Sequence, residues 1–132
     1  MPRTVGRQRE RGILRLSVEA AERVHLQGYV VYCVVAVCAD GVRRRWRRYS
    51  QFLQLKEGLA SADARLIAGT AEFPKKKWRQ TLSFGAIERR RVRLHAFVSS
   101  LLENPLDFKS RVSLRSFLAL EPPVAPPAPP PS

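Results

Sequence analysis

The chain has few of the residues from which catalytic and metal sites are built. Only two histidines and two cysteines occur among 132 residues. Neither histidine has Cys, Asp or Glu at a metal-ligand spacing. No Ser, Cys and His arrangement indicates a nucleophile, no glycine-rich loop indicates a nucleotide site, and no carboxylate pair is suited to acid–base work. We therefore interpret the chain as a binding module, not an enzyme, and expect no metal and no cofactor.

Long apolar runs are also missing. The longest, residues 29–39, is about half of the ~20 residues that a membrane-spanning helix needs. Cys33 and Cys38 are five residues apart in this run, so on a strand their side chains point to opposite faces and a disulfide between them is not expected. Unpaired cysteines without a signal peptide favour a reducing, cytoplasmic setting.

Acidic residues are scarce. Against 24 Lys and Arg there are 11 Asp and Glu, which gives a formal net charge of +13 at pH 7. A chain of this charge repels itself when compact, so we expect a large anionic partner, either nucleic acid or an acidic membrane. The hydrophobic fraction of 45% over 132 residues is sufficient for one globular core.

The composition divides the chain into three regions. Residues 1–12 are rich in arginine but have no apolar periodicity, which predicts a disordered basic arm rather than a transit peptide. Residues 121–132 are dominated by Pro and Ala and predict a disordered tail. Its Pro123-Val124-Ala125-Pro126 has the minimal spacing of an SH3 ligand but lacks the orienting Arg, so a spacer is favoured over an SH3-type partner. The folded domain is predicted to span residues 13–120.

The first half of this domain predicts a sheet. Alternation over residues 13–18 and the Val-rich run at 29–38 indicate two strands, and residues 42–49 indicate a third. Asp40-Gly41 marks a tight turn between the last two, so we expect an antiparallel meander. Arg43, Arg44 and Arg45 interrupt the alternation of the third strand.

The second half predicts helices. Ser50 can cap a short helix that ends near Gly58, with Phe52, Leu55 and Leu59 at helical spacing. Residues 60–83 show no sustained period and predict a long connection. A second helix begins at Phe84 and stops at Asn104-Pro105. Its apolar stripe is formed by Ile87, Leu94, Phe97, Val98 and Leu101. A last helix near residues 108–118 would close the core with Val112, Phe117 and Leu118.

Three basic sites stand out within this framework. They are Arg47-Arg48-Tyr49 at a strand–helix junction, Lys75-Lys76-Lys77 after Phe73-Pro74, and Arg89-Arg90-Arg91 in the second long helix. Arg gives planar bidentate donors to phosphate, and Tyr gives a flat face to a ring. Arg90 falls on the apolar stripe of its helix, where an unpaired guanidinium costs several kcal/mol. We therefore expect Arg90 to have a partner, either a carboxylate or a ligand.

The order of these motifs resembles that of the phox homology (PX) domain. Three strands are followed by Arg-Arg-Tyr-Ser-x-Phe, a Phe-Pro-x-Lys loop, and Ile-Glu-x-Arg-x-x-x-Leu-x-x-Phe, over roughly residues 13–120. The resemblance implies an α+β fold in which a three-stranded antiparallel sheet packs against a subdomain of three to four helices. It also implies a peripheral protein that reads phosphoinositides in endosomal trafficking, as sorting nexins do.

The resemblance further implies a role for each basic site in binding phosphatidylinositol 3-phosphate. Arg48 matches the arginine that grips the 3-phosphate, Tyr49 the ring under the inositol, Lys76 the lysine at the 1-phosphate, and Arg90 the arginine on the ring hydroxyls. Four further side chains would support the site by charge. They are Arg47, Lys75, Lys77 and Arg91.

Apolar residues before the second long helix are candidates for entering the bilayer. They are Trp78, Leu82 and Phe84, with core packing as the alternative for each and the favoured one for Phe84. The expected partner is then an acidic membrane that carries phosphatidylinositol 3-phosphate, and the expected location is the cytoplasmic face of early endosomes or another phosphoinositide-bearing membrane.

Two other functions stay open on the sequence. One is a basic nucleic-acid-binding domain with Trp46, Tyr49 and Trp78 as stacking platforms, although the basic residues follow no recognised groove motif. The other is a PX-type scaffold that binds other phosphoinositides or proteins. A salt bridge from Arg90 to Glu88 or Glu57 would favour the scaffold, because the arginine would then need no ligand.

Overall fold

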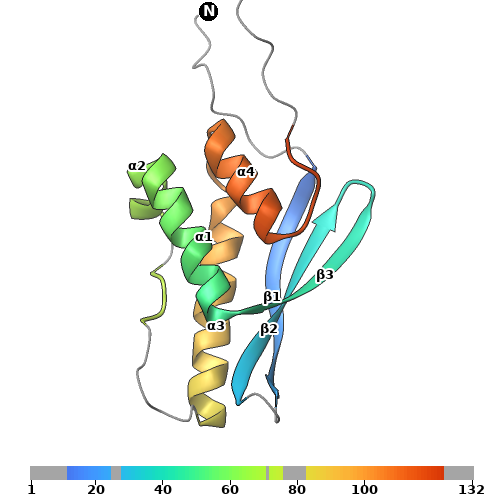
Figure 1. Cartoon of the computed structure of the whole chain (residues 1–132), viewed down its shortest axis with the longest axis vertical. Helices are drawn as coiled ribbons and strands as arrows, with labels where there is room; N and C mark the ends of the chain where they lie inside the picture. Colours follow the sequence, from blue (N-terminus) through green and yellow to red (C-terminus); the bar gives the residue numbers. More distant parts are fainter. Residues whose placement is uncertain (1–11, 25–27, 71, 76–82, 124–132) are drawn as a thin grey trace, which may run out of the picture.

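A computed structural model describes residues 12–24, 28–70, 72–75 and 83–123 of the chain. Its described part contains a three-stranded sheet and four helices (Figure 1). The elements are β1 (Ile13–Val24), β2 (Tyr29–Cys38), β3 (Gly41–Arg48), α1 (Tyr49–Ala62), α2 (Ala64–Ala68), α3 (Phe84–Leu101) and α4 (Phe108–Phe117). The predicted fold class is confirmed. The predicted arm and tail lie largely outside the described residues.

The sheet is an antiparallel meander with β2 in the centre. β2 is buried along most of its length because it has a neighbour on each side, which suits its run of Val. Cys38 pairs with Gly41 across the predicted tight turn, and Gly41 has a φ of +141°, which glycine tolerates best. Both cysteines are buried thiols that form no disulfide, as expected, and Cys38 contributes to the core.

The arginines of β3 do not disrupt the strand. Along the strand half-buried and exposed positions alternate, and Arg45 and Arg47 occupy half-buried ones. Arg45 Nε donates to the Leu118 carbonyl at 2.9 Å, and Arg47 Nε donates to the Phe117 carbonyl at 2.8 Å. These carbonyls lie at the end of α4, where they have no partner within the helix. The two guanidiniums thus attach β3 to α4.

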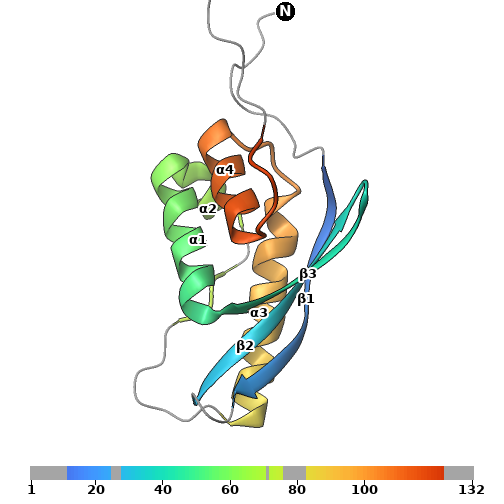
Figure 2. The ribbon, with the colours of Figure 1, turned by 45° about the vertical axis from the view of Figure 1, so that its right-hand side comes forward.

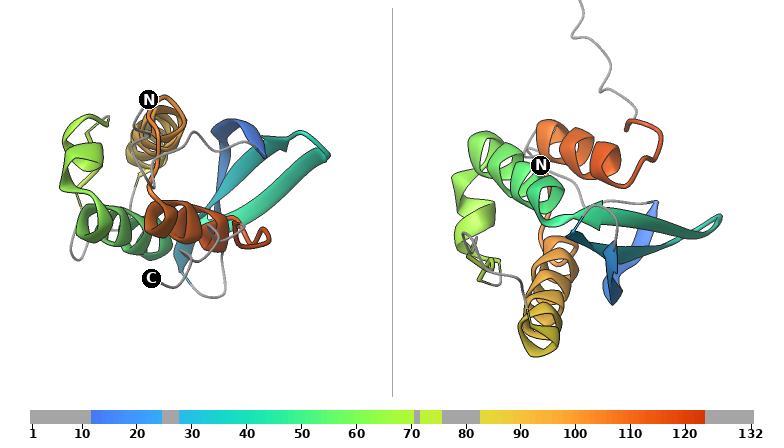
Figure 3. Two further views of the ribbon diagram at one scale, coloured as in Figure 1. Left: turned by 90° about the horizontal axis from the view of Figure 1, so that it is seen from above. Right: turned by 60° about the horizontal axis from the view of Figure 1, so that its bottom comes forward.

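Two predictions for the middle of the chain are wrong. α1 begins at Tyr49 with Arg48 at its N-cap position, two residues before the predicted cap Ser50, and it continues to Ala62. The connection after it is not structureless, because the Asp63 side chain accepts from the Arg65 N–H and starts α2. Gly58 lies inside α1 rather than at its end. A Cβ there would meet Ser113 Oγ at 3.3 Å, so glycine allows α1 and α4 to approach each other closely, as Figure 3 shows.

α3 covers the edge of β1 that has no partner strand (Figure 2). Arg91 Nη1 donates to the Val18 carbonyl at 2.6 Å, His95 Nδ1 accepts from the Val18 N–H at 3.0 Å, and Ser99 Oγ donates to the Leu16 carbonyl at 2.9 Å. The predicted apolar stripe of α3 is buried. This helix ends at Leu101, before the predicted Asn104-Pro105 stop.

The last helix completes the core, with one correction to the predicted residues. Phe117 and Leu118 are buried as predicted, but Val112 is 37% exposed because it lies on the outer face of α4. Ala119 follows the helix with a φ of +53°, and the Leu120 N–H bonds to the Arg115 carbonyl at 2.8 Å. No helix in the described part of the chain is long and apolar enough to cross a membrane.

Candidate functional site

Arg90 lies where α3, the start of α1 and the segment 72–75 meet. It is half-buried, and its guanidinium carbon lies 4.3 Å from the centre of the Tyr49 ring. Its Nη2 donates to the Lys75 carbonyl across a long 3.4 Å. The structure therefore brings together two of the four predicted headgroup residues, Tyr49 and Arg90, in one cation–π contact.

Tyr49 is held in place from two sides. Its hydroxyl donates to the Pro74 carbonyl at 2.6 Å, and its ring lies 5.6 Å from the Phe73 ring, which in turn packs on Phe97 at 5.0 Å. Burial raises the pKa of the Tyr49 hydroxyl, and the charge of Arg90 acts in the opposite direction. One aromatic ring thus fixes both the segment 72–75 and the guanidinium of Arg90.

Beside this contact lies Tyr32 of β2, which the sequence analysis did not single out. Its side chain is 0% exposed, and no described residue forms a hydrogen bond with its hydroxyl within normal limits. Burial raises the pKa of Tyr32, whereas the charge of Arg90 and the hydrogen-bonding capacity of its guanidinium lower it. The signal available in the sequence was a phenol within the Val-rich run of β2.

Arg48 is next to Tyr49 in the chain but has a different environment. It is exposed, and its guanidinium carbon lies 3.9 Å from the centre of the Tyr29 ring at the start of β2. Its backbone N–H donates to Gln51 Oε1 at 2.9 Å, which fixes the main chain at the start of α1. An exposed cation–π contact is worth only about 0.5–1 kcal/mol, so this guanidinium can turn toward an anion at low cost.

Two of the predicted supporting residues serve the fold. Arg47 donates to the end of α4, and burial together with the charge of Arg45 lowers its pKa. Arg91 forms a bidentate pair with Glu88, with Nε to Oε2 at 2.9 Å, in addition to its bond to β1. The hydrogen bond from Arg91 holds the pKa of Glu88 below its usual range. Glu88 is therefore the partner of Arg91 and not of Arg90.

The remaining predicted residues lie around the segment before α3. Lys75 is exposed, while Lys76, Lys77, Trp78 and Leu82 lie outside the described residues. Phe84 is 93% exposed, so the expectation that it packs into the core is wrong. It is the first residue of α3, and the first buried position of that helix is Ile87, one turn later.

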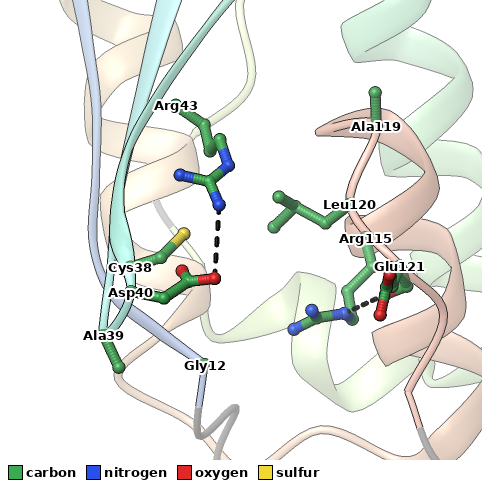
Figure 4. Close-up of a pocket in the computed structure, with 9 residues that line it drawn as sticks. All are labelled: Gly12, Cys38, Ala39, Asp40, Arg43, Arg115, Ala119, Leu120 and Glu121. Carbon is green, nitrogen blue, oxygen red and sulfur yellow. Dashed lines mark hydrogen bonds and ion pairs between the residues drawn. The ribbon is translucent and has the colours of Figure 1, made fainter.

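A separate pocket of about 360 Å³ lies at the other end of the sheet, between the β2–β3 turn and the segment after α4 (Figures 1 and 4). Two arginines line it. Arg43 Nη2 pairs with Asp40 Oδ2 at 3.2 Å, and Arg115 Nε donates to the Glu121 carbonyl. Since Asp40 and Glu121 bring as much negative charge as the arginines bring positive, this pocket offers an anion less than Arg90 does.

Comparisons with known proteins agree with this geometry. A family model described as PX domain matches residues 40–121. The crystal structure of the mouse SNX19 PX domain with bound sulphate ion has a TM-score of 0.58 at 25% identity, covering 83% of this chain and 97% of that one. The solution structure of the Vam7p PX domain has a TM-score of 0.55 at 27% identity, covering 87% and 100%. The X-ray structure of a designed CISK-PX domain has a TM-score of 0.58 at 23% identity, covering 68% and 85%. A search of curated proteins gives no match.

Proposed function

Because the chain belongs to the PX domain family, whose members are generally phosphoinositide-binding modules that target membranes, we propose that it binds phosphatidylinositol 3-phosphate on early endosomes. The protein would act as a peripheral adaptor on the cytoplasmic face. The headgroup would be held by Arg48, Tyr49, Lys76 and Arg90, with charge support from Lys75 and Lys77.

The observation that carries this proposal is the state of Arg90. Its guanidinium is half-buried on the Tyr49 ring, and among the described residues no carboxylate forms an ion pair with it. A partly desolvated cation without a counter-charge is costly. A ligand with hydroxyl and phosphate oxygens would supply both the missing charge and the missing acceptors. Since Glu88 pairs with Arg91, the arrangement expected of a scaffold without a ligand is not found there.

The other headgroup residues are assigned by the family motif. Arg48 would leave the Tyr29 ring to grip the 3-phosphate, which is a small loss because an exposed cation–π contact is weak. Arg47, which bonds to the Phe117 carbonyl, would not take part directly. The SNX19 PX domain was solved with a sulphate ion, which is in keeping with an anion site in this fold.

Membrane attachment would combine charge and insertion. The net charge of +13 draws the protein toward an acidic leaflet, at about 1 kcal/mol per basic residue near the surface. Phe84 is exposed at the start of α3, about two turns before Arg90, and would enter the bilayer together with Trp78 and Leu82. Each apolar side chain adds at most about 1.5–3 kcal/mol.

The test is loss of headgroup binding in single variants. Arg90→Gln and Arg48→Gln should each weaken binding of soluble inositol 1,3-bisphosphate by about 10- to 100-fold, because each removes charge-assisted hydrogen bonds to phosphate or hydroxyl. Isothermal titration calorimetry measures this directly. Arg93→Gln removes the same charge from an exposed position on α3 and should change headgroup affinity little.

Two outcomes would contradict the proposal. If the wild type and both site variants bound the headgroup with equal affinity, the proposed headgroup site would be ruled out. An oligonucleotide that displaces the protein from phosphatidylinositol 3-phosphate vesicles as well as the soluble headgroup does, at physiological salt, would favour nucleic-acid binding. Vesicles carrying each of the seven phosphoinositides in turn would show whether the singly phosphorylated lipid is preferred.

A further inference from the structure

The hydroxyl of Tyr32 is a buried polar group that the fold itself does not explain. Tyr32 is 0% exposed, its oxygen forms no hydrogen bond with any described residue, and its ring packs edge-on against Phe52 at 6.0 Å. A buried hydroxyl without a partner costs about 1–3 kcal/mol. Phenylalanine would fill the same space without that cost, so the hydroxyl calls for another explanation.

The charged group that acts on this hydroxyl is the guanidinium of Arg90. The charge and the hydrogen-bonding capacity of Arg90 both lower the pKa of Tyr32. The guanidinium carbon of Arg90 lies 4.3 Å from the centre of the Tyr49 ring. A guanidinium has five N–H donors. The contact from Arg90 Nη2 to the Lys75 carbonyl is long, at 3.4 Å, so it holds the group only weakly.

We propose that Tyr32 is a positioning residue of the headgroup site, which rests on the function proposed above. Its hydroxyl oxygen accepts a hydrogen bond from Arg90 when that guanidinium turns from the Lys75 carbonyl to a phosphoinositide. The Tyr49 ring then fixes the plane of the guanidinium, and the Tyr32 hydroxyl fixes its direction within that plane. The remaining N–H groups are left aimed at the ligand.

Tyr32 suits this role because its own position is fixed. It lies on the central strand, with both its ring and that of Phe52 in the core. An acceptor whose own position is fixed before the ligand arrives loses little entropy when Arg90 turns to it, so the hydrogen bond raises affinity without a new contact to the ligand. Because the hydroxyl is fully buried, its effect on the headgroup is indirect and passes through Arg90.

The test is Tyr32→Phe, with Ser110→Ala as a matched control. Ser110 Oγ is the other buried side-chain atom without a hydrogen bond among the described residues, and it lies on α4. Each variant removes one buried oxygen that has no hydrogen bond. The unfolding temperature of each variant should therefore be equal to or higher than that of the wild type. Only Tyr32→Phe should weaken binding of soluble inositol 1,3-bisphosphate, by about 3- to 10-fold.

A double-mutant cycle with Arg90→Lys shows whether the effect passes through Arg90. Lysine lacks the planar fork and cannot donate to Tyr32 and the ligand in the same geometry. Tyr32→Phe should therefore cause no further loss in the Arg90→Lys background. An equal fold-loss in both backgrounds, or wild-type affinity of Tyr32→Phe alone, would overturn the role of Tyr32 while leaving the headgroup site intact. Failure of the wild type to bind the headgroup would instead overturn the function itself, and this inference with it.

Discussion

Arg90 and Arg91 are neighbours on α3 and differ in almost every contact. Arg91 has a carboxylate partner in Glu88 and a backbone partner in Val18, so its charge is satisfied within the protein. Arg90 has an aromatic face and one long bond to a carbonyl. The difference arises because successive helix positions are about 100° apart, which directs one side chain to β1 and the other to α1. Of the two, only Arg90, which is directed to α1, is available to a ligand.

At the same scale, Ala119 is an alanine where glycine is usual. Its φ of +53° belongs to the last bonds of α4, in which the Ala119 N–H bonds to the Ser116 carbonyl and the Leu120 N–H to that of Arg115. We expect Ala119→Gly to raise the free energy of unfolding by about 0.5–1 kcal/mol, because glycine adopts this φ without strain.

Thermal unfolding followed by circular dichroism would measure this change as an increase of about 2–4 °C. Ala96→Gly is the control with the opposite sign. Ala96 is exposed within α3, where glycine should lower stability by about 1 kcal/mol. A lower unfolding temperature for both variants would mean that the positive φ of Ala119 is not strained.

At the scale of elements, β3 is attached to α4 by side chains that would be expected to face solvent. Arg45 and Arg47 bond to the last carbonyls of α4, and the Arg47 guanidinium lies 5.9 Å from the centre of the Phe117 ring. These positions therefore use cations where an amphipathic strand would place aliphatic residues. A high charge on this strand is consistent with a stable fold, because two of its cations also cap a helix.

This attachment predicts an asymmetry within β3. Arg47→Met keeps much of the apolar stem but removes the donors, and should lower the free energy of unfolding by about 1–2 kcal/mol. Arg44→Met changes an exposed residue of the same strand and should stay within about 0.5 kcal/mol of the wild type. Urea unfolding of both variants decides the point, and equal stability of the two would show that the bonds to α4 contribute little.

At the scale of the whole molecule, the start of α1 with Tyr49 and the start of α3 with the exposed Phe84 both lie away from the β2–β3 turn (Figure 1). An acidic membrane that approaches from this side would meet Phe84 and the proposed headgroup site together. Charge acts over about 10 Å at ordinary salt, so it would guide the approach, whereas insertion and headgroup contacts act only on touching. Attraction and recognition should therefore be separable by experiment.

We expect Phe84→Ala to weaken binding to vesicles that contain phosphatidylinositol 3-phosphate by about 10-fold, because it removes one inserted side chain. Its affinity for soluble inositol 1,3-bisphosphate should not change. Vesicle sedimentation and calorimetry provide the two measurements. Leu14→Ala removes an exposed apolar side chain near the opposite end of β1 and should leave both unchanged. Reduced headgroup binding by Phe84→Ala would show that Phe84 shapes the site instead of inserting.

The sequence alone predicted the order and type of most elements and the composition of the core. Period-2 alternation, the Asp40-Gly41 turn and the apolar stripe of α3 are local patterns, and local backbone geometry follows from them. α2 was missed because five residues started by Asp63 carry too little periodicity to detect. The motif order also led to the family, because three separate motifs at compatible spacing rarely coincide.

Only the tertiary structure decided which of the many arginines are available to a ligand. The motifs assigned Arg90 to the headgroup and both Arg47 and Arg91 to its support by charge, but a guanidinium reaches several ångströms and its partner depends on which groups pack nearby. Phe117 of α4, Val18 of β1 and Tyr49 of α1 are 41 or more residues away from the arginines they meet. Such pairings, and the buried Tyr32 hydroxyl beside Arg90, depend on long-range packing that no local pattern specifies.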